Sequence, residues 1–127
     1  MRKKILIADD DHEFVSLLKE RLFSSGYDVV FAYEGIRTVE VAHKEKPDLI
    51  ILDWKMPVGR GSDVLMDLRS KADSSHIPII VLTGVHEEGM EEKALGLGAK
   101  AFLKKPCDDK ILLKTIKEVL EWKTLKI

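Results

Sequence analysis

The chain has 127 residues, which suits one domain built around a single core, because such cores usually span about 100–150 residues. Its 21 basic and 22 acidic side chains nearly cancel, which excludes the strongly basic footprint of a protein that binds nucleic acid directly. No run approaches the ~20 apolar residues of a membrane span, and a single cysteine, Cys107, suits a reducing compartment, so we expect a cytoplasmic domain without membrane insertion that covers residues 1–127.

Five short apolar runs recur along the chain, each too short for a helix and typical of a strand that is buried on both faces. They lie at residues 5–8, 29–31, 49–52, 79–82 and 101–103. Stretches with the helical spacing of apolar residues follow them, at residues 14–22, 36–43, 64–68, 87–97 and 111–122. This alternation predicts an α/β fold in which a parallel five-stranded sheet carries helices on both faces.

The same spacing predicts which helical side chains face the core and where a helix begins. On the first helical stretch we expect one buried stripe made of Phe14, Leu17, Leu18 and Leu22. We expect Ser62 to cap the third helix, because a serine oxygen can accept a hydrogen bond from the free N–H groups at a helix start.

Ionisable and hydroxyl side chains follow four of the five predicted strands. Asp9, Asp10 and Asp11 come after the first strand, and Asp53 follows the third. The fourth strand ends at Thr83, and the fifth runs into Lys104, Lys105 and Pro106. Right-handed crossovers bring the carboxyl ends of all strands to the same side of the sheet, where open α/β sheets bind their ligands. These side chains are therefore expected to converge on one site.

Carboxylates gathered in one site repel each other, and a hard divalent cation relieves that repulsion. Oxygen ligands alone suit Mg²⁺, which typically takes one or two carboxylates and water. An Asp carboxylate can act as a nucleophile that forms an aspartyl phosphate, with Lys105 as a point charge and Thr83 as a hydroxyl donor for phosphoryl oxygens. The residues thus indicate a phosphoryl-transfer site, while Asp11 is expected to cap the following helix.

Four segments, in this order, resemble the motifs of the receiver domain of two-component response regulators. Residues 5–11 resemble the acidic-pair motif, and residues 47–57, with Gly61 after them, resemble the phosphoacceptor motif. Residues 81–84 resemble the switch hydroxyl motif, and residues 98–106 resemble the closing Lys-Pro motif. The resemblance covers essentially the whole chain and implies a flavodoxin-like (βα)5 sandwich with the strand order 2-1-3-4-5.

The resemblance implies a role for each residue of the site. Asp53 would be the phosphoacceptor. Asp10 and Asp53 would bind Mg²⁺ directly and Asp9 mainly through water, while the backbone carbonyl of Lys55 would be the third direct ligand. Lys105 would contact the phosphoryl group, and its bond to the following proline is expected to be cis.

The resemblance also implies a switch. A histidine kinase or a histidine phosphotransfer protein would donate the phosphoryl group, after which Thr83 would move toward it and the ring of Phe102 would turn inward. Phe102 stands where tyrosine is frequent, so it has no hydroxyl with which to signal. The change would act on the face formed by the fourth helix, fifth strand and fifth helix, a possible surface for a homodimer or an effector. Such a domain is regulatory and catalyses only its own phosphorylation and slow dephosphorylation.

Three alternatives remain open at this point. A phosphatase resembling the haloacid-dehalogenase superfamily would use Asp9 as its nucleophile and Asp11 as general acid, although Glu13 stands where threonine or valine is usual. Nucleotide or flavin binding would call for a Gly-x-Gly-x-x-Gly segment after the first strand or a Gly-Lys-Ser/Thr loop, and the sequence has neither. A protein-binding domain without phosphorylation would not need the acids, Thr83 and Lys105. The four histidines are spread without the spacing of a zinc site.

Overall fold

The computed structural model describes residues 2–125 and the side chains of residues 2–122. Strands and helices alternate in the order expected from the sequence. The strands are β1 (Lys4–Ala8), β2 (Asp28–Ala32), β3 (Leu49–Leu52), β4 (Ile79–Thr83) and β5 (Ala101–Lys104). The helices are α1 (His12–Ser24), α2 (Gly35–Glu45), α3 (Gly61–Ser70), α4 (Met90–Gly96) and α5 (Asp109–Leu125).

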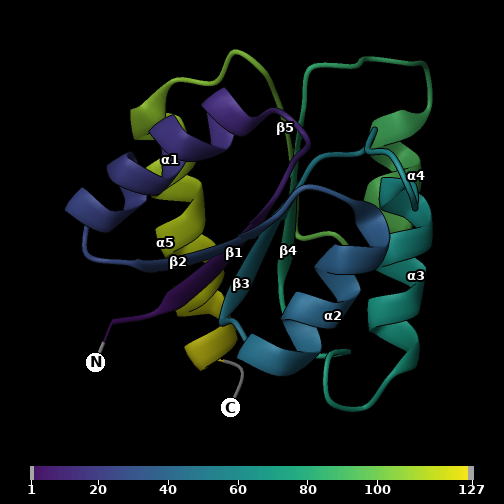
Figure 1. Ribbon diagram of the computed structural model, residues 1–127, viewed down its shortest axis with the longest axis horizontal. Helices are drawn as coiled ribbons and strands as arrows, with labels where there is room; N and C mark the ends of the chain where they lie inside the picture. Colours follow the sequence, from purple (N-terminus) through teal and green to yellow (C-terminus); the bar gives the residue numbers. More distant parts are fainter. Residues whose placement is uncertain (1, 126–127) are drawn as a thin grey trace.

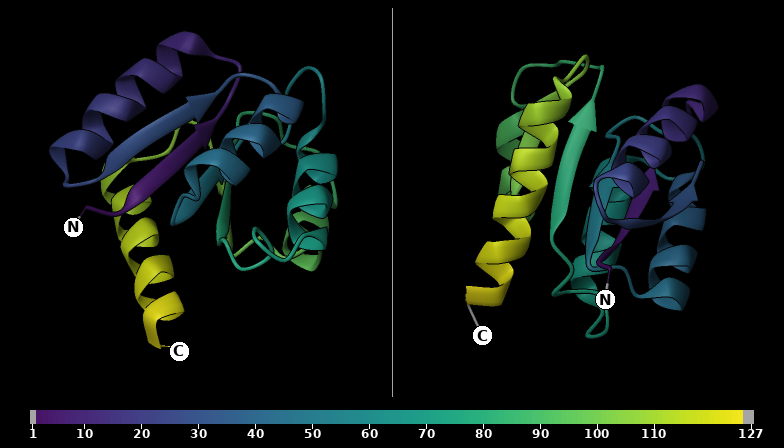
Figure 2. Two further views of the ribbon diagram at one scale, coloured as in Figure 1. Left: turned by 60° about the horizontal axis from the view of Figure 1, so that its bottom comes forward. Right: turned by 90° about the vertical axis from the view of Figure 1, so that its left-hand side faces the viewer.

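The five strands form one parallel sheet in the order β2-β1-β3-β4-β5, which confirms the predicted α/β, flavodoxin-like fold. Figure 1 shows α1 and α5 on one side of the sheet and α2, α3 and α4 on the other. The two further views in Figure 2 show the same layers. Each predicted strand is present, and its observed ends lie within one residue of the predicted ones.

Side chains of the central strands alternate between two apolar cores, one on each face of the sheet. Leu6, Ile50 and Ile79 point into the core under α2, α3 and α4. Ile5 and Ile51 point into the core under α1 and α5. All five side chains are almost completely buried, which explains why the strands are continuous apolar runs rather than alternating ones.

Two details of the helices differ from the prediction. Leu17 is 59% exposed, and Val15 takes its place in the core beside Leu18, so the buried stripe of α1 is shifted around the helix. Ser62 does not cap α3, which begins one residue earlier, at Gly61. The backbone N–H of Gly61 donates to the carbonyl oxygen of Trp54 at 2.9 Å, and this contact with the preceding loop sets the helix start instead.

The start of α2 is packed against the β3–α3 loop by two glycines that touch. A Cβ atom on Gly35 would lie 2.0 Å from the carbonyl oxygen of Gly59, so only glycine fits at position 35. Two backbone hydrogen bonds hold the same contact, from Gly35 to Pro57 (3.1 Å) and from Ile36 to Val58 (2.8 Å). The loop that follows Asp53 is thereby fixed to the first turn of α2.

We call the side of the sheet where the strands finish its carboxyl end and the opposite side its amino end. The loops β1–α1, β3–α3, β4–α4 and β5–α5 lie at the carboxyl end, as the right-handed crossovers require. None of the helices in the described part of the chain is both long enough and apolar enough to cross a membrane.

Candidate functional site at the carboxyl end of the sheet

Three aspartates meet at the carboxyl end of the sheet, as predicted. Asp9, Asp10 and Asp53 each place a carboxylate oxygen within 4.8 Å of the other two. Backbone hydrogen bonds continue the sheet one residue beyond the strands, from Asp9 to Ala32 (3.1 Å) and from Asp53 to Ala8 (2.9 Å). These bonds fix the backbone of both aspartates. Asp9 and Asp53 are 2% and 7% exposed, whereas Asp10 faces solvent, so the cluster is a buried pair with an exposed third member.

Lys105 balances part of this negative charge. Its Nζ lies 2.6 Å from Asp9 Oδ2 and 3.6 Å from Asp53 Oδ2, and its side chain is 20% exposed. The Lys105 N–H donates to the carbonyl oxygen of Thr83 at 2.9 Å, which ties the β5–α5 loop to the end of β4. The peptide bond between Lys105 and Pro106 is cis, as the sequence resemblance implied.

The surroundings of Asp9 destabilise its negative charge. Burial raises the pKa of Asp9 above its ordinary value of 3.8, and repulsion from Asp53 raises it further. Hydrogen bonds from Lys105 and from the Asp11 N–H (2.9 Å), together with the charge of Lys105, lower the pKa and oppose that shift. The balance leaves Asp9 harder to ionise than an aspartate in water, which indicates that the ammonium group alone does not compensate for burial and crowding.

Asp11 serves the helix rather than the cluster. Its side-chain oxygen Oδ1 accepts a hydrogen bond from the Phe14 N–H at 3.0 Å, so it is the N-terminal cap of α1, as expected.

Thr83 and Phe102 lie on neighbouring strands beside the cluster. Thr83 is the last residue of β4 and is 1% exposed, and its Oγ1 accepts a hydrogen bond from the Val85 N–H at 3.3 Å. Phe102 lies in β5 opposite Val81 of β4 and is partly buried against the core on the α4 side. The hydroxyl and the ring therefore occupy adjacent strands.

Two loops face each other across a groove next to Asp53. The Lys55 N–H donates to Asp53 Oδ1 at 3.2 Å, and the Lys55 Nζ forms an ion pair with Glu87 Oε1 of the β4–α4 loop at 2.9 Å. Arg60 and Lys93 line the same groove. The hydrogen bond and the positive charge of Lys55 lower the pKa of Glu87, with a smaller contribution from Arg60. The role of Glu87 is not predictable from the sequence, because its partner Lys55 lies more than thirty residues away.

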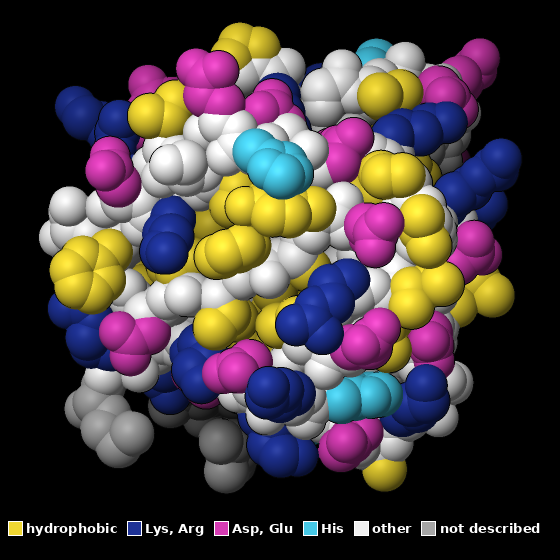
Figure 3. Space-filling view, viewed as in Figure 1, with side chains coloured by type: hydrophobic (Ala, Val, Ile, Leu, Met, Phe, Trp, Pro, Cys, Tyr) yellow, Lys and Arg dark blue, Asp and Glu magenta, His cyan; other side chains and the backbone are white. Residues whose placement is uncertain are grey.

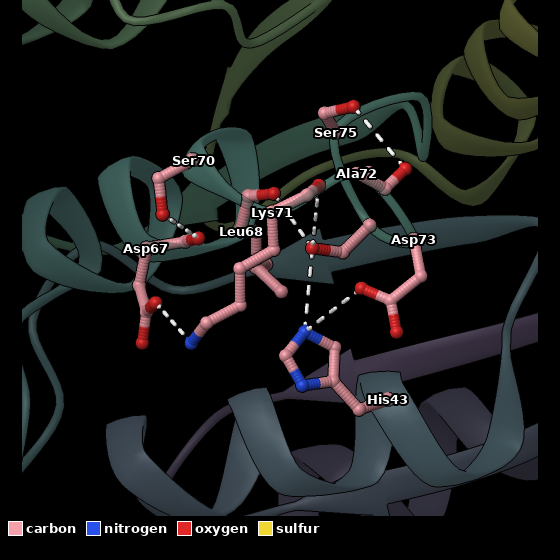
Figure 4. Close-up of polar contacts among 9 residues, drawn as sticks. His43, Asp67, Leu68, Ser70, Lys71, Ala72, Asp73 and Ser75 are labelled. Atoms are coloured by element: carbon pink, nitrogen blue, oxygen red, sulfur yellow. Dashed lines mark hydrogen bonds and ion pairs between the residues drawn. The ribbon is translucent and has the colours of Figure 1, made fainter.

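The amino end of the sheet carries a different polar group, in which His43 takes part. The His43 Nε2 lies 3.3 Å from Ser74 Oγ and 3.7 Å from Asp73 Oδ1, and Ser74 Oγ donates to the carbonyl oxygen of Leu68 at 2.7 Å (Figure 4). This arrangement joins α2 to the α3–β4 loop. The ring nitrogen faces both Ser74 and Asp73, so the three do not form a relay of the kind that activates a serine.

Surface charge is mixed on the face of the molecule seen in Figure 1. Basic and acidic side chains are interspersed there, with hydrophobic side chains gathered near the middle (Figure 3). Charge on this face is therefore mixed rather than divided into a basic area and an acidic one.

The donor set of the cluster fits a hard divalent cation. The three carboxylates offer oxygen atoms only, and they come from the ends of two adjacent strands, β1 and β3. A cation held there would offset the burial and repulsion that raise the pKa of Asp9. The oxygen-only donor set of these residues thus suits Mg²⁺.

Comparison with known proteins agrees with this geometry. Residues 5–117 match the family model described as response regulator receiver domain. The chain is 38% identical over 120 residues to the alkaline phosphatase synthesis transcriptional regulatory protein PhoP of Bacillus subtilis, covering 94% of this chain and 49% of PhoP. It is 32% identical to the response regulator PleD of Caulobacter vibrioides, covering 97% of this chain and 27% of PleD. The chain thus spans half or less of these two relatives.

Other matches cover nearly the full length of both chains. The polar-differentiation response regulator DivK of Brucella anthropi is 29% identical, and the match covers 94% of this chain and 98% of DivK. A CheY-like receiver domain from Methanospirillum hungatei superimposes with a TM-score of 0.94 at 28% identity, covering all of both chains. The BeF3-activated receiver domain of Klebsiella pneumoniae RstA reaches a TM-score of 0.85 at 32% identity, covering 92% of this chain and 97% of that one. With the aspartates and the lysine in place at the ends of these strands, this chain belongs to the family of response regulator receiver domains.

Proposed function

We propose that the chain is a phosphorylation-dependent signalling switch that accepts a phosphoryl group on Asp53 from a histidine kinase or a histidine phosphotransfer protein. Response regulator receiver domains are regulatory and interact with such donors. The observation that carries the proposal is the meeting of three carboxylates within 4.8 Å with the ammonium group of Lys105 at the same place. A structurally similar receiver domain is described as activated by BeF3, which has the shape of a phosphoryl group.

The transfer step assigns a task to each side chain. An oxygen of Asp53 attacks the phosphorus of a phosphohistidine, an O–P bond forms, the P–N bond breaks, and the electron pair stays on the imidazole nitrogen. Lys105, whose Nζ is 3.6 Å from Asp53 Oδ2, offers its positive charge to a phosphoryl oxygen. The Lys55 N–H bond to Asp53 Oδ1 limits which way the nucleophile can turn.

The acid cluster is the proposed site for Mg²⁺. Asp10 and Asp53 would hold the ion directly, Asp9 mainly through water, and the backbone carbonyl of Lys55 would be a further ligand. Bound there, the ion neutralises charge on the phosphoryl oxygens, and most catalysis of phosphoryl transfer is positioning and charge stabilisation of this kind.

The output follows from the strands next to the site. In the proposed switch, Thr83 moves toward the phosphoryl group and Phe102 turns inward, which changes the face made by α4, β5 and α5. A homodimer partner or an effector would read that face. The domain spans residues 1–127 in this proposal, acts in the cytoplasm, and catalyses only its own phosphorylation and slow dephosphorylation.

The phosphatase alternative has less support. It needs Asp11 as general acid, but the Asp11 carboxylate is bound to the Phe14 N–H as a helix cap. It also needs Asp9 as nucleophile, whereas Asp9 is engaged by Lys105 at 2.6 Å and has a raised pKa.

The proposal is tested by incubating the purified chain with Mg²⁺ and acetyl phosphate and locating the labelled residue by mass spectrometry. We expect the label on Asp53, no label in Asp53→Asn, and little label when EDTA removes the metal. A matched control is Asp48→Asn, just before β3 at the amino end, where the carboxylate accepts a hydrogen bond from the Lys4 N–H at 2.8 Å. We expect this variant to be labelled like the wild type. Full labelling of Asp53→Asn would overturn the assignment, and a label on Asp9 would favour the phosphatase.

A further inference from the structure

The ammonium group of Lys105 has a third neighbour besides the two carboxylates. Its Nζ lies 4.1 Å from the centre of the Phe14 ring, in addition to 2.6 Å from Asp9 Oδ2 and 3.6 Å from Asp53 Oδ2. Phe14 belongs to the first turn of α1, and Lys105 follows the last strand of the sheet. The contact therefore joins opposite ends of the sequence at the candidate site.

The two sides of the contact differ in freedom of movement. The backbone N–H of Phe14 is bound to the Asp11 side chain at 3.0 Å, and its ring is partly buried against the core under α1 and α5. Lys105 is anchored by its own N–H, 2.9 Å from the Thr83 carbonyl oxygen, but its charge sits at the end of a flexible four-carbon chain. The ring is thus fixed in place, and it can restrict the position of the more mobile ammonium group.

The chemistry of the contact is attractive. The face of an aromatic ring carries partial negative charge and attracts an ammonium group within about 6 Å of its centre, more strongly where water is excluded. The Lys105 side chain is 20% exposed, so most of it is withdrawn from solvent. An aliphatic side chain of similar size would fill the same space without this attraction.

We propose that Phe14 is a positioning residue that holds the ammonium group of Lys105 over Asp9 and Asp53, ready for the incoming phosphoryl group. This inference rests on the proposed function of the same site. Phe14 does not touch the reacting atoms and acts through Lys105, whose preset position avoids the cost of ordering a flexible side chain during the transfer.

The first experiment compares the rate constants of phosphorylation by acetyl phosphate in Mg²⁺. We expect Phe14→Leu to lower the rate constant about two- to fivefold, the size of an ammonium–ring attraction at a partly exposed site, and Phe14→Tyr to stay within about twofold of the wild type. Acetyl phosphate is a small donor, so the measured rate constant does not depend on docking of a partner protein on α1. Phe23→Leu is the matched control, because its ring near the end of α1 faces the Arg2 guanidinium at 4.4 Å, and we expect no change. A wild-type rate in Phe14→Leu would overturn the inference.

The second experiment asks whether Phe14 acts through Lys105. In a Lys105→Gln background, Phe14→Leu is expected to cause no further loss of rate, because no ammonium group remains to be held. An equal fold-loss in both backgrounds would show that the ring acts by another route. Urea denaturation of each variant separates this result from a loss of folded protein.

A spectroscopic measurement keeps this inference separate from the proposed function. In the metal-free protein, we expect the ring of Phe14 to shift the Lys105 ε-proton resonances upfield, and we expect this shift to be retained in Phe14→Tyr and lost in Phe14→Leu. Absence of the shift in the wild type would defeat the positioning role even if Asp53 is phosphorylated. A wild type that shows the shift but takes no label would defeat the proposed function instead.

Discussion

At the amino end of the sheet Arg69 donates hydrogen bonds to three backbone carbonyls, whereas at the carboxyl end Asp9, Asp10 and Asp53 crowd together beside Lys105. The Arg69 guanidinium reaches Ser75 O (3.2 Å) and Ile77 O (2.8 Å) before β4, and Gly98 O (3.1 Å) before β5. Burial lowers the pKa of Arg69, so its charge is kept at some cost, but its donors are matched to acceptors. At the carboxyl end burial and repulsion instead raise the pKa of Asp9.

The difference separates side chains that stabilise the fold from side chains that carry its chemistry. Among the described residues, no buried side-chain nitrogen or oxygen lacks a hydrogen-bond partner, so both ends satisfy the geometric requirement. They differ in electrostatics, because the crowded like charges at the carboxyl end repel each other, and binding a cation would relieve that repulsion. Substitutions that remove hydrogen bonds at the amino end should therefore lower stability and spare phosphorylation, while substitution of a crowded carboxylate at the carboxyl end should raise stability and lower phosphorylation.

The largest loss of stability is expected for Arg69→Met. It removes the donor for three carbonyl oxygens, and we expect the free energy of unfolding to fall by about 2–4 kcal/mol, given the strength of hydrogen bonds from a charged group. Urea denaturation measures this loss. The labelling of Asp53 by acetyl phosphate should be unchanged where the variant is folded, and Arg69→Lys should recover part of the stability. A folded Arg69→Met protein that takes no label would break the comparison.

Asp9→Asn should change stability in the opposite direction. Because the folded state holds the Asp9 proton more tightly than the unfolded state, the stability contributed by this group falls as the pH rises from 3.8 through the raised pKa. In EDTA at pH 7 the variant should be more stable than the wild type by about 0.5–2 kcal/mol, as is usual when a strained functional site is relieved.

Denaturation at two pH values checks this prediction. The gain should disappear near pH 3, where Asp9 is protonated in both states, and labelling in Mg²⁺ should fall. A variant that is less stable at pH 7 would show that the pairing of Asp9 with Lys105 outweighs its burial.

Ser74→Ala sharpens the comparison at the amino end. The substitution leaves the carbonyl oxygen of Leu68 without its side-chain donor and removes the contact with His43, so we expect a loss of about 1–2 kcal/mol in the free energy of unfolding. Ser70→Ala is a matched control, since the Ser70 hydroxyl also donates to a backbone carbonyl, that of Asp67, but lies exposed on α3 (Figure 4). Equal losses in the two variants would contradict the role assigned to burial.

The smallest effect is expected for Lys55→Met at the carboxyl end. Removing the Lys55 charge should raise the pKa of Glu87 toward its ordinary value of 4.5, which an NMR titration of the Glu87 carboxylate can follow. The lowered pKa of Glu87 favours the folded state above pH 4.5, and this contribution is lost as the pH falls through the folded value. Both partners are exposed, so no change in stability should be resolved. Lys93→Met, in the same groove, should leave the Glu87 pKa in place.

The strands were predictable because a strand that is buried on both faces has apolar residues at consecutive positions. The predicted run at residues 49–52 coincides with β3, and the ends of the others differ by a single residue. The bounds of α4 were predicted less well, because the prediction covered residues 87–97 whereas the helix spans Met90–Gly96. It begins after Gly89, whose φ of +81° places it in the left-handed region, and the preceding glutamates belong to a loop that bonds across the groove.

The site was predictable wherever chain order alone decides position. Parallel strands bring Asp9, Asp53 and Lys105 to the same end of the sheet whatever the side chains do, and the structure places them within bonding distance. The sequence placed the ring of Phe14 in the core stripe of α1. No local pattern shows that this ring meets an ammonium group from the far end of the chain. Contacts of this kind depend on where α1 packs across the sheet.

The close approach of Gly35 to Gly59 bears on how mutational scans of this protein are read. Gly35 is the buried first residue of α2 and is far in the sequence from the β3–α3 loop that follows Asp53, so a scan read by sequence position alone would not connect it with that loop. An added methyl group at position 35 would nevertheless clash with the carbonyl oxygen of Gly59 and displace the loop that follows Asp53. A signalling defect at this glycine would therefore report a mechanical coupling between two loops, and not a separate contact site for a partner.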